Sequence, residues 1–232
     1  MHPCLACHRA ADRQAARHTQ HFRALVRARQ PRHGHAERPP TIHDFGRSLP
    51  APLFDLQYPA PGDPQLAGRV RELVGTAEVS LDQDWGLDHG TWSVLLKAYP
   101  DADVPVVQLS IDASRPGAWH HELGRTLRPL RDEGVLIMGT GNVVHNLGVM
   151  QWSDTAEPYD WATRFNDYVI GAIRDDEPDK LFEPQSLGRD ATLSVPSMDH
   201  YLPLLYVLGA RHRGRCVAHR CRRTSCTSRS AC

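Results

Sequence analysis

The sequence predicts a single α/β domain whose central sheet is parallel or mixed and is flanked by helices. Two apolar stretches, residues 104–111 (VPVVQLSI) and 135–140 (VLIMGT), are typical of strands buried on both faces. A helical stretch of about seventeen residues separates them, and strand, helix and strand in this order form a βαβ unit. The length of 232 residues suits one domain of this class.

The ordered core is expected to span residues 39–210. Within it, residues 64–75 predict a helix, because Leu66 and Val70 recur on one helical face and a glycine ends the pattern. Residues 92–98 predict a short helix that follows a turn-like Asp-His-Gly sequence.

The middle of the core is predicted to be a strand, a helix and a second strand. Residues 104–111 predict the first strand, and Ser114-Arg115-Pro116 predicts the cap of a helix that runs to about Asp132. Gly134 ends that helix, and residues 135–140 predict the second strand. Ligands of such sheets bind outside the carboxyl ends of the strands, so the segment after residue 140 is a candidate site.

The last part of the core is predicted to be helical. Residues 159–174 predict a helix, because Trp161, Phe165 and Val169 recur at helical spacing. Ser197 is the expected N-cap of the last helix, which we expect to run through Tyr206.

The two ends of the chain differ from the core in composition. Arginine crowds the last twenty residues, and we expect residues 211–232 to be an atypical Arg/Cys-rich tail. Residues 1–38 are expected to be atypical and poorly ordered or a loose helix, because only a weak helical pattern surrounds Phe22. All six cysteines lie in these ends: Cys4, Cys7, Cys216, Cys221, Cys226 and Cys232.

Four explanations of the ends stay open. A zinc site is one, although the cysteines of the tail lack the short paired spacings of zinc motifs. A disulfide framework and a basic disordered tail are two others. Our preferred hypothesis is translation out of frame, because a GC-rich gene read in the wrong frame yields Arg, Ala, His, Cys and Ser without hydrophobic period.

Charge and composition argue against several classes of function. The formal net charge is zero, which does not favour nucleic acid or a membrane surface as the main partner. No apolar stretch approaches the roughly 18 to 20 residues that cross a bilayer, and we expect a cytoplasmic protein. The sequence holds no G-x-S-x-G elbow and no Walker or dinucleotide fingerprint.

Three histidines stand at the ends of apolar elements in polar, loop-like settings: His89, His145 and His200. Imidazole binds divalent metals and exchanges protons near neutral pH, so each is a candidate for either role. The alternative is a half-buried histidine bonded to the backbone. His120 and His121 are weaker candidates, because we expect them on a solvated helix face.

Six segments of the core carry a resemblance to bacterial class III extradiol ring-cleavage dioxygenases of the 4,5-DOPA type. They appear in the family's order: residues 40–46 (PTIHDFG), 58–62 (YPAPG), 85–92 (WGLDHGTW), 107–112 (VQLSID), 141–146 (GNVVHN) and 200–206 (HYLPLLY). The resemblance implies an α/β fold and a metal-dependent oxidoreductase that opens a catechol ring with O2.

The resemblance also implies roles for the three histidines and one metal ion per chain, non-haem Fe(II) or Zn(II). His145 matches a histidine assigned as the acid/base group or as a metal ligand. His200 matches a metal ligand, and His89 matches a catalytic pocket histidine that contacts substrate or dioxygen. A metal and a base that act on one catechol must lie within a few ångströms of each other, so we expect all three histidines around one pocket.

The sequence departs from the family in its first 38 residues. Family members carry a His-Gly-Ser-Pro and a Ser-Ala-His-Trp motif there, each with a metal-binding histidine, and this chain has neither. We therefore expect little ring cleavage from the chain as written. Two functions follow as hypotheses: an extradiol dioxygenase, or a catalytically silent relic of the fold.

Overall fold

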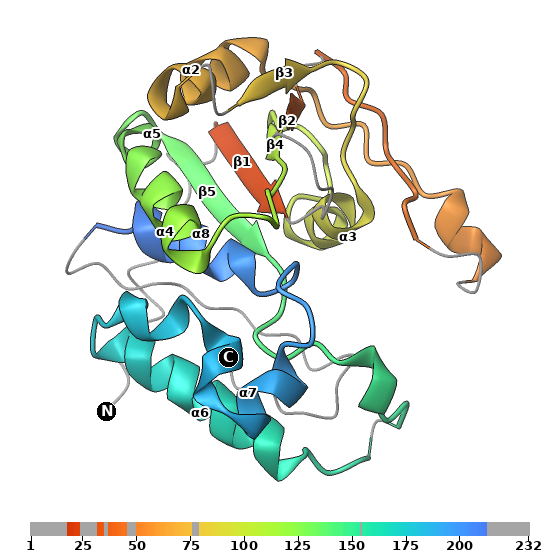
Figure 1. Ribbon diagram of the computed structural model, residues 1–232. Helices are drawn as coiled ribbons and strands as arrows, with labels where there is room; N and C mark the ends of the chain where they lie inside the picture. Colours follow the sequence, from red (N-terminus) through yellow and green to blue (C-terminus); the bar gives the residue numbers. More distant parts are fainter. Residues whose placement is uncertain are drawn as a thin grey trace, which may run out of the picture.

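Figure 1 shows the computed structural model of the chain, which describes residues 18–23, 32–34, 37–45, 50–75, 79–153 and 155–212, the first two ranges by their backbone alone. The explanations offered for the six cysteines, and the prediction for the tail from residue 213 onward, lie outside these residues. The expectation for residues 1–38 lies outside them for the most part.

Strands and helices follow one another along a single mixed α/β domain, as the sequence predicts. In chain order the elements are β1 (His18–Arg23), β2 (Arg32–Gly34), η1 (Ala51–Phe54), α2 (Pro64–Val74), β3 (Ser80–Asp82), α3 (His89–Ala98), β4 (Gln108–Leu109), α4 (Gly117–Thr126), α5 (Pro129–Asp132), β5 (Val135–Thr140), η2 (Leu147–Val149), α6 (Asp160–Arg174), η3 (Pro178–Leu181), η4 (Pro184–Leu187), α7 (Arg189–Ser194) and α8 (Leu202–Ala210).

The strands form one sheet in the order β3-β2-β4-β1-β5. β1 runs parallel to both β4 and β5, whereas β2 is parallel to β3 and antiparallel to β4. The register pairs His18 with Val135 and Arg23 with Thr140, so β1 and β5 end at the same edge of the sheet. The segment after Thr140 leaves the sheet from this edge.

The helices with the clearest periodicity form where the sequence predicts them. α2 begins at Pro64 after Asp63, whose carboxylate accepts a hydrogen bond from the Leu66 amide at 2.9 Å, and it ends at Gly75, which has φ 101°. α6 buries Phe165 and Val169 on its inner face. The sequence predicts these two helices correctly because α2 carries its own cap and α6 carries its own apolar stripe.

Other boundaries differ from the prediction. The helix expected to run to Asp132 divides into α4 and α5, because Pro129 has no N–H to donate to a continuous helix. The expected cap fails as well: Ser114 donates its hydroxyl to Asp112 at 2.5 Å, and the N-cap position belongs to Pro116, which makes no side-chain hydrogen bond.

Three further expectations are corrected. The strand expected over 104–111 forms ladder hydrogen bonds only at Gln108–Leu109. The last helix begins at Leu202, after a turn, and Ser197 is not its cap. The weak helical pattern at Phe22 corresponds to no helix there, because Phe22 lies in β1 and pairs with Gly139.

α8 packs between β5 and α4 and is almost entirely buried (Figure 1). Two glycines let the backbones of α4 and α8 touch. A Cβ on Gly124 would lie 2.3 Å from the Tyr206 carbonyl oxygen, and a Cβ on Gly209 would lie 2.0 Å from that of His121. Only glycine fits at this crossing.

His120 corrects the expectation of a solvated helix face, because it has no exposed surface. Its Nδ1 lies 2.9 Å from the buried Tyr206 hydroxyl at the α4–α8 contact. Burial lowers the pKa of the ring to about 4, against smaller opposing effects of Arg115 and Asp112. His120 is therefore a neutral structural residue at neutral pH. His121 is half-buried, with its ring 5.2 Å from that of Phe182.

Substitution of Gly124 tests the close crossing of α4 and α8. Gly124→Ala should destabilise the protein by about 1 to 3 kcal/mol, because the new Cβ displaces backbone rather than a flexible side chain. Gly171→Ala in α6 is the matched control: no atom lies within 4 Å of its added Cβ, so it should stabilise by about 0.5 to 1 kcal/mol. Urea unfolding measures both, and equal midpoints for the two variants would contradict the crossing.

The buried imidazole of His120 should make the fold sensitive to mild acid. Its pKa is about 4 in the fold against 6.5 for the free side chain, so unfolding takes up a proton below pH 6.5. The free energy of unfolding should therefore fall by about 3 kcal/mol as the pH drops from 6.5 to 4. His120→Gln should flatten this dependence in urea titrations, whereas Tyr206→Phe, which keeps the buried ring, should retain it. The same slope in both variants would exclude His120 as the cause.

Candidate functional site

The carboxyl end of β5 is joined directly to the turn that precedes α8. The amide of Asn142 donates to the carbonyl oxygen of His200 at 2.9 Å, and the amide of His145 donates to that of Ser194 at 2.8 Å. A Cβ on Gly141 would lie 2.2 Å from the His200 carbonyl oxygen. The glycine is therefore required for this approach, which brings two histidines 55 positions apart in the sequence to one place.

The imidazole rings of His145 and His200 stack on each other. Their centroids are 3.6 Å apart and their planes differ by 17°. The His200 side chain is 24% exposed, so it remains accessible to a small molecule. The structure thus brings together two of the three histidines that the sequence singled out.

Polar neighbours orient both rings. Asn142 Nδ2 lies 3.3 Å from His145 Nδ1; an amide nitrogen only donates, so this contact favours Nδ1 as acceptor and a proton on Nε2. His200 Nε2 lies 3.5 Å from a carboxylate oxygen of Asp199. Asn146, the other asparagine of the motif, donates to the Leu193 carbonyl oxygen at 2.8 Å and caps η2.

Three buried polar atoms, on residues next to the two histidine segments in the sequence, have no hydrogen-bond partner within the described part of the chain. They are the Thr140 hydroxyl at the end of β5, Asp199 Oδ1 and the Tyr201 hydroxyl. Burial raises the pKa of Tyr201, so its hydroxyl keeps its proton and remains a donor. Unpaired buried polar atoms are destabilising. Tyr201 is 1% exposed and its ring lies 6.3 Å from that of Phe165 in α6, so it is a core residue.

The described side chains do not by themselves form a metal centre. A mononuclear site needs about three protein ligands, and among the residues with described side chains no group of three His, Cys, Asp or Glu is placed to hold one ion. The stack also prevents His145 and His200 from sharing an ion in this arrangement. Imidazole lone pairs lie in the ring plane, and in two nearly parallel rings with centroids 3.6 Å apart they do not converge on one ion at a metal–nitrogen distance of about 2.1 Å.

His89 is held by Asp44, which the sequence did not mark as a candidate site residue. It is the first residue of α3 rather than part of a loop, and its Nδ1 lies 2.7 Å from Asp44 Oδ1. Asp44 belongs to the segment PTIHDFG, yet only its place in that motif marked it, because its partner is 45 positions away. That His89 lines one pocket with His145 and His200 stays a prediction.

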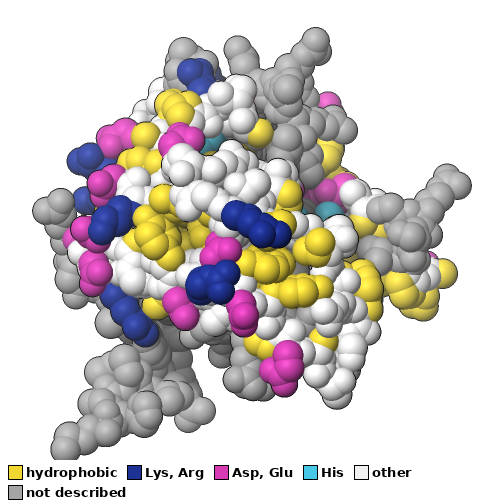
Figure 2. All heavy atoms as spheres, turned by 60° about the horizontal axis from the view of Figure 1, so that its bottom comes forward, with side chains coloured by type: hydrophobic (Ala, Val, Ile, Leu, Met, Phe, Trp, Pro, Cys, Tyr) yellow, Lys and Arg dark blue, Asp and Glu magenta, His cyan; other side chains and the backbone are white. Residues whose placement is uncertain are grey.

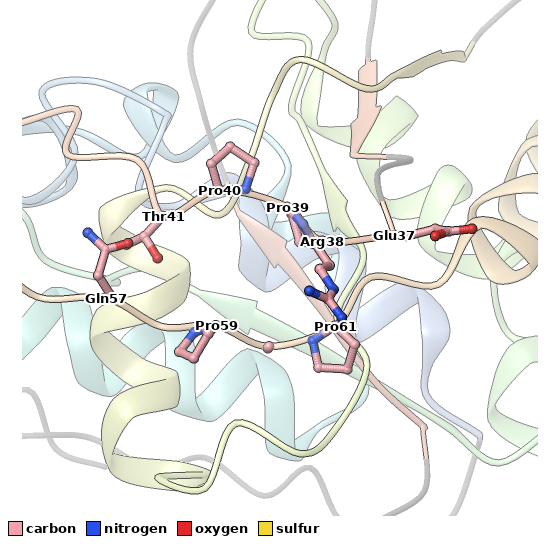
Figure 3. A pocket seen from close by; sticks show the side chains of 9 residues that line it. Glu37, Arg38, Pro39, Pro40, Thr41, Gln57, Pro59 and Pro61 are labelled. Atoms are coloured by element: carbon pink, nitrogen blue, oxygen red, sulfur yellow. The ribbon is translucent and has the colours of Figure 1, made fainter.

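A cavity of about 420 Å³ opens elsewhere, between two extended segments (Figure 3). It is lined by Glu37, Arg38, Pro39, Pro40, Thr41, Gln57, Pro59, Ala60 and Pro61. None of the three candidate histidines lines it. Four of the lining residues are prolines, and the titratable residues of the lining are Glu37 and Arg38, so the cavity has no imidazole for acid/base chemistry. We do not assign the reaction to this cavity.

The surface shows charges of both signs. On the face turned forward in Figure 2, basic and acidic side chains alternate with small hydrophobic patches. Arg164 with Asp190 and Lys180 with Glu177 are ion pairs on the described surface. In the described part of the chain, no helix is long and apolar enough to span a membrane.

Comparison with known proteins gives a consistent family. Residues 21–228 match the model of the catalytic LigB subunit of aromatic ring-opening dioxygenase. The chain is 53% identical over 177 residues to 4,5-DOPA dioxygenase extradiol of Escherichia coli K12, which covers 75% of this chain and 65% of the relative. It is 38% identical over 174 residues to the protein of the same name from Beta vulgaris, covering 73% and 64%. The chain thus spans just under two thirds of these relatives.

A solved structure is similar as well. The crystal structure of an uncharacterized protein from Escherichia coli K12 aligns with a TM-score of 0.67 and 43% sequence identity. The alignment covers 85% of this chain and 76% of that one. The described arrangement of strands and helices is therefore one that a related sequence adopts in a crystal.

Substitution of Gly141 tests how the histidine pair is assembled. Gly141→Ala should push the His200 turn away from β5, because the added Cβ meets backbone at 2.2 Å. The ring-current shifts that each imidazole induces in the other should then disappear from the NMR spectrum. Gly68→Ala in α2, with no atom within 4 Å of its Cβ, is the control and should leave the shifts unchanged. Retained shifts in Gly141→Ala would contradict the assembly.

Proposed function

This chain belongs to the family of the catalytic LigB subunit of aromatic ring-opening dioxygenases, and from that membership we propose that it is an extradiol dioxygenase. The reaction would open a catechol ring next to the diol and incorporate both atoms of O2. The observation that supports this most directly is the stacked His145–His200 pair, which lies at the carboxyl end of β5, where α/β sheets bind ligands.

We propose a DOPA-like catechol as the substrate. Three relatives, from Escherichia coli, Beta vulgaris and Portulaca grandiflora, are named 4,5-DOPA dioxygenase extradiol and are 53%, 38% and 37% identical to the chain. Asn142, His145 and His200 at the edge of the sheet offer donors and acceptors for hydroxyl groups.

His145 is proposed as the acid/base group. Its Nδ1 accepts from Asn142, so in this orientation Nε2 carries the proton and can donate it to a reacting oxygen. To take up a catechol proton, His145 must release Nδ1 from Asn142; an imidazole exchanges protons in both directions near neutral pH. His200 is proposed as a metal ligand and His89 as a catalytic residue that contacts substrate or dioxygen.

The metal is proposed to be Fe(II) or Zn(II), one ion per chain, on the strength of family membership. The described residues supply His200 and, in a different arrangement, His145, but they do not complete a centre. No step of the reaction is therefore assigned to the ion. The division of roles that suits the stack is a ligand at His200 and an acid/base group at His145.

A catalytically silent relic of the fold is the second candidate. It is favoured by one observation, the lack of three suitably placed metal ligands among the described side chains. Metal content separates the two candidates. A dioxygenase purified from iron-supplemented cells should carry about one equivalent of metal that dialysis does not remove, whereas a relic should carry none.

Ring opening of DOPA in air tests the proposal directly. We expect little yellow ring-opened product from the Fe(II)-loaded chain as written, since residues 1–38 lack both family histidine motifs. A hybrid in which the corresponding segment of the Escherichia coli relative replaces residues 1–38 should cleave DOPA.

The controls use single histidines of the hybrid. His145→Ala should lower the rate by about a hundredfold or more, as loss of an acid/base group does, while His121→Gln on α4 should leave it unchanged. A hybrid that binds metal but does not open DOPA would refute the proposal. Fast turnover by the chain as written, abolished by His145→Ala, would instead show that residues 1–38 supply what catalysis needs.

A further inference from the structure

The start of α3 is tied to the sheet by a fully buried polar pair. Asp88 and Gln108 bond twice: the Gln108 amide donates to Asp88 Oδ2 at 2.8 Å, and the Asp88 backbone amide donates to Gln108 Oε1 at 3.1 Å. Thr91 completes the network: its hydroxyl donates to Gln108 Oε1, and its backbone amide donates to Asp88 Oδ1. Asp88 is 0% and Gln108 2% exposed, so the backbone position of His89, the next residue, is rigid.

Asp44 then fixes the ring of His89. Its Oδ1 accepts the His89 backbone amide at 2.9 Å and lies 2.7 Å from His89 Nδ1. A carboxylate only accepts, so Nδ1 carries the proton and the neutral ring has its lone pair on Nε2. Phe45 packs against the same imidazole, with centroids 5.4 Å apart at 86°.

The charge at Asp44 is suited to this role. Burial opposes ionisation of the carboxyl, but the hydrogen bonds and charge of His89 outweigh it and lower the pKa of Asp44. The Asp44 side chain is 15% exposed, whereas that of His89 is 35% exposed. The carboxylate is therefore more sheltered from solvent than the ring.

Two titratable residues next to Asp44 and His89 in the sequence make hydrogen bonds of their own. His43, on the same segment as Asp44, directs Nε2 to the Leu56 carbonyl oxygen at 2.9 Å. Asp88, on α3, uses both carboxylate oxygens for Thr91 and Gln108. Asp44 is the carboxylate whose contact defines the His89 tautomer.

We infer that Asp44 is a positioning residue that holds His89 as the Nδ1–H tautomer, so that Nε2 acts as a base toward a hydroxyl of the bound catechol. The step moves one proton from the catechol oxygen to Nε2 and leaves a phenolate beside an imidazolium that Asp44 stabilises. This inference rests on the proposed function, and it adds to it a second proton acceptor besides His145.

Two substitutions separate orientation from charge. Asp44→Ala removes the acceptor, so neutral His89 should revert to the Nε2–H tautomer. Asp44→Asn keeps an oxygen that both N–H groups can use, so it should retain Nδ1–H without the negative charge. Long-range ¹H–¹⁵N NMR correlations of the full chain above pH 8 distinguish the tautomers, with His89→Gln for assignment.

A matched control is Asp82→Ala. Asp82, at the end of β3, also accepts two amides through one oxygen, from Asp84 at 2.9 Å and Trp85 at 3.2 Å. It should leave the His89 tautomer unchanged. An Nε2–H tautomer in the unmodified chain, or Nδ1–H in Asp44→Ala, would overturn the inference.

Binding of 4-nitrocatechol, whose visible absorption changes on deprotonation, tests the base itself. At a fixed pH near 6, its ionisation equilibrium on the protein should shift toward the neutral form by about tenfold in Asp44→Ala and in Asp44→Asn. An unchanged equilibrium in both variants would overturn the role of His89 as a base. If 4-nitrocatechol does not bind at all while the tautomers behave as expected, the proposed function fails and the positioning of His89 by Asp44 stands.

Discussion

The close approach of the chain from Asp199 to Ala210 to β5 and α4 is the contact on which the rest of the site depends. It is a backbone contact, made where Gly124, Gly141 and Gly209 face carbonyl oxygens at distances that no Cβ tolerates. Because α8 is buried on almost every side, its position also determines how β5 and α4 pack. A shift of α8 would therefore disturb the core and the histidine pair together.

The approach has a chemical consequence at the edge of the sheet. The Asn142 amide bonds to the His200 carbonyl oxygen, and the imidazoles of His145 and His200 stack at 3.6 Å between centroids. Two imidazolium ions at this separation would repel each other, since like charges a few ångströms apart disfavour joint ionisation. The stack therefore fits the proposal of two different roles, an acid/base group at His145 and a ligand at His200.

Sequence reasoning succeeded where structure is local. The apolar run of β5, the capped helix α2 and the periodic helix α6 each carry their own signal, and each formed within a residue or two of its predicted bounds. It failed where distant contacts decide. The burial of His120 depends on Tyr206, 86 positions away, and no pattern around His120 indicates that partner. The division into α4 and α5 could have been foreseen from Pro129.

The candidate site divides in the same way. His89, His145 and His200 could be chosen from their positions at the ends of apolar elements, but their surroundings could not. Asp44 and His89 are 45 positions apart in the sequence, and Asp88 and Gln108 are 20 apart. No periodic pattern in the sequence therefore indicates either pairing. Buried polar groups must find partners, and those partners are set by the packing of the sheet against α3. The sequence thus indicates which residues carry the chemistry, while the fold determines the hydrogen bond that gives each imidazole its orientation.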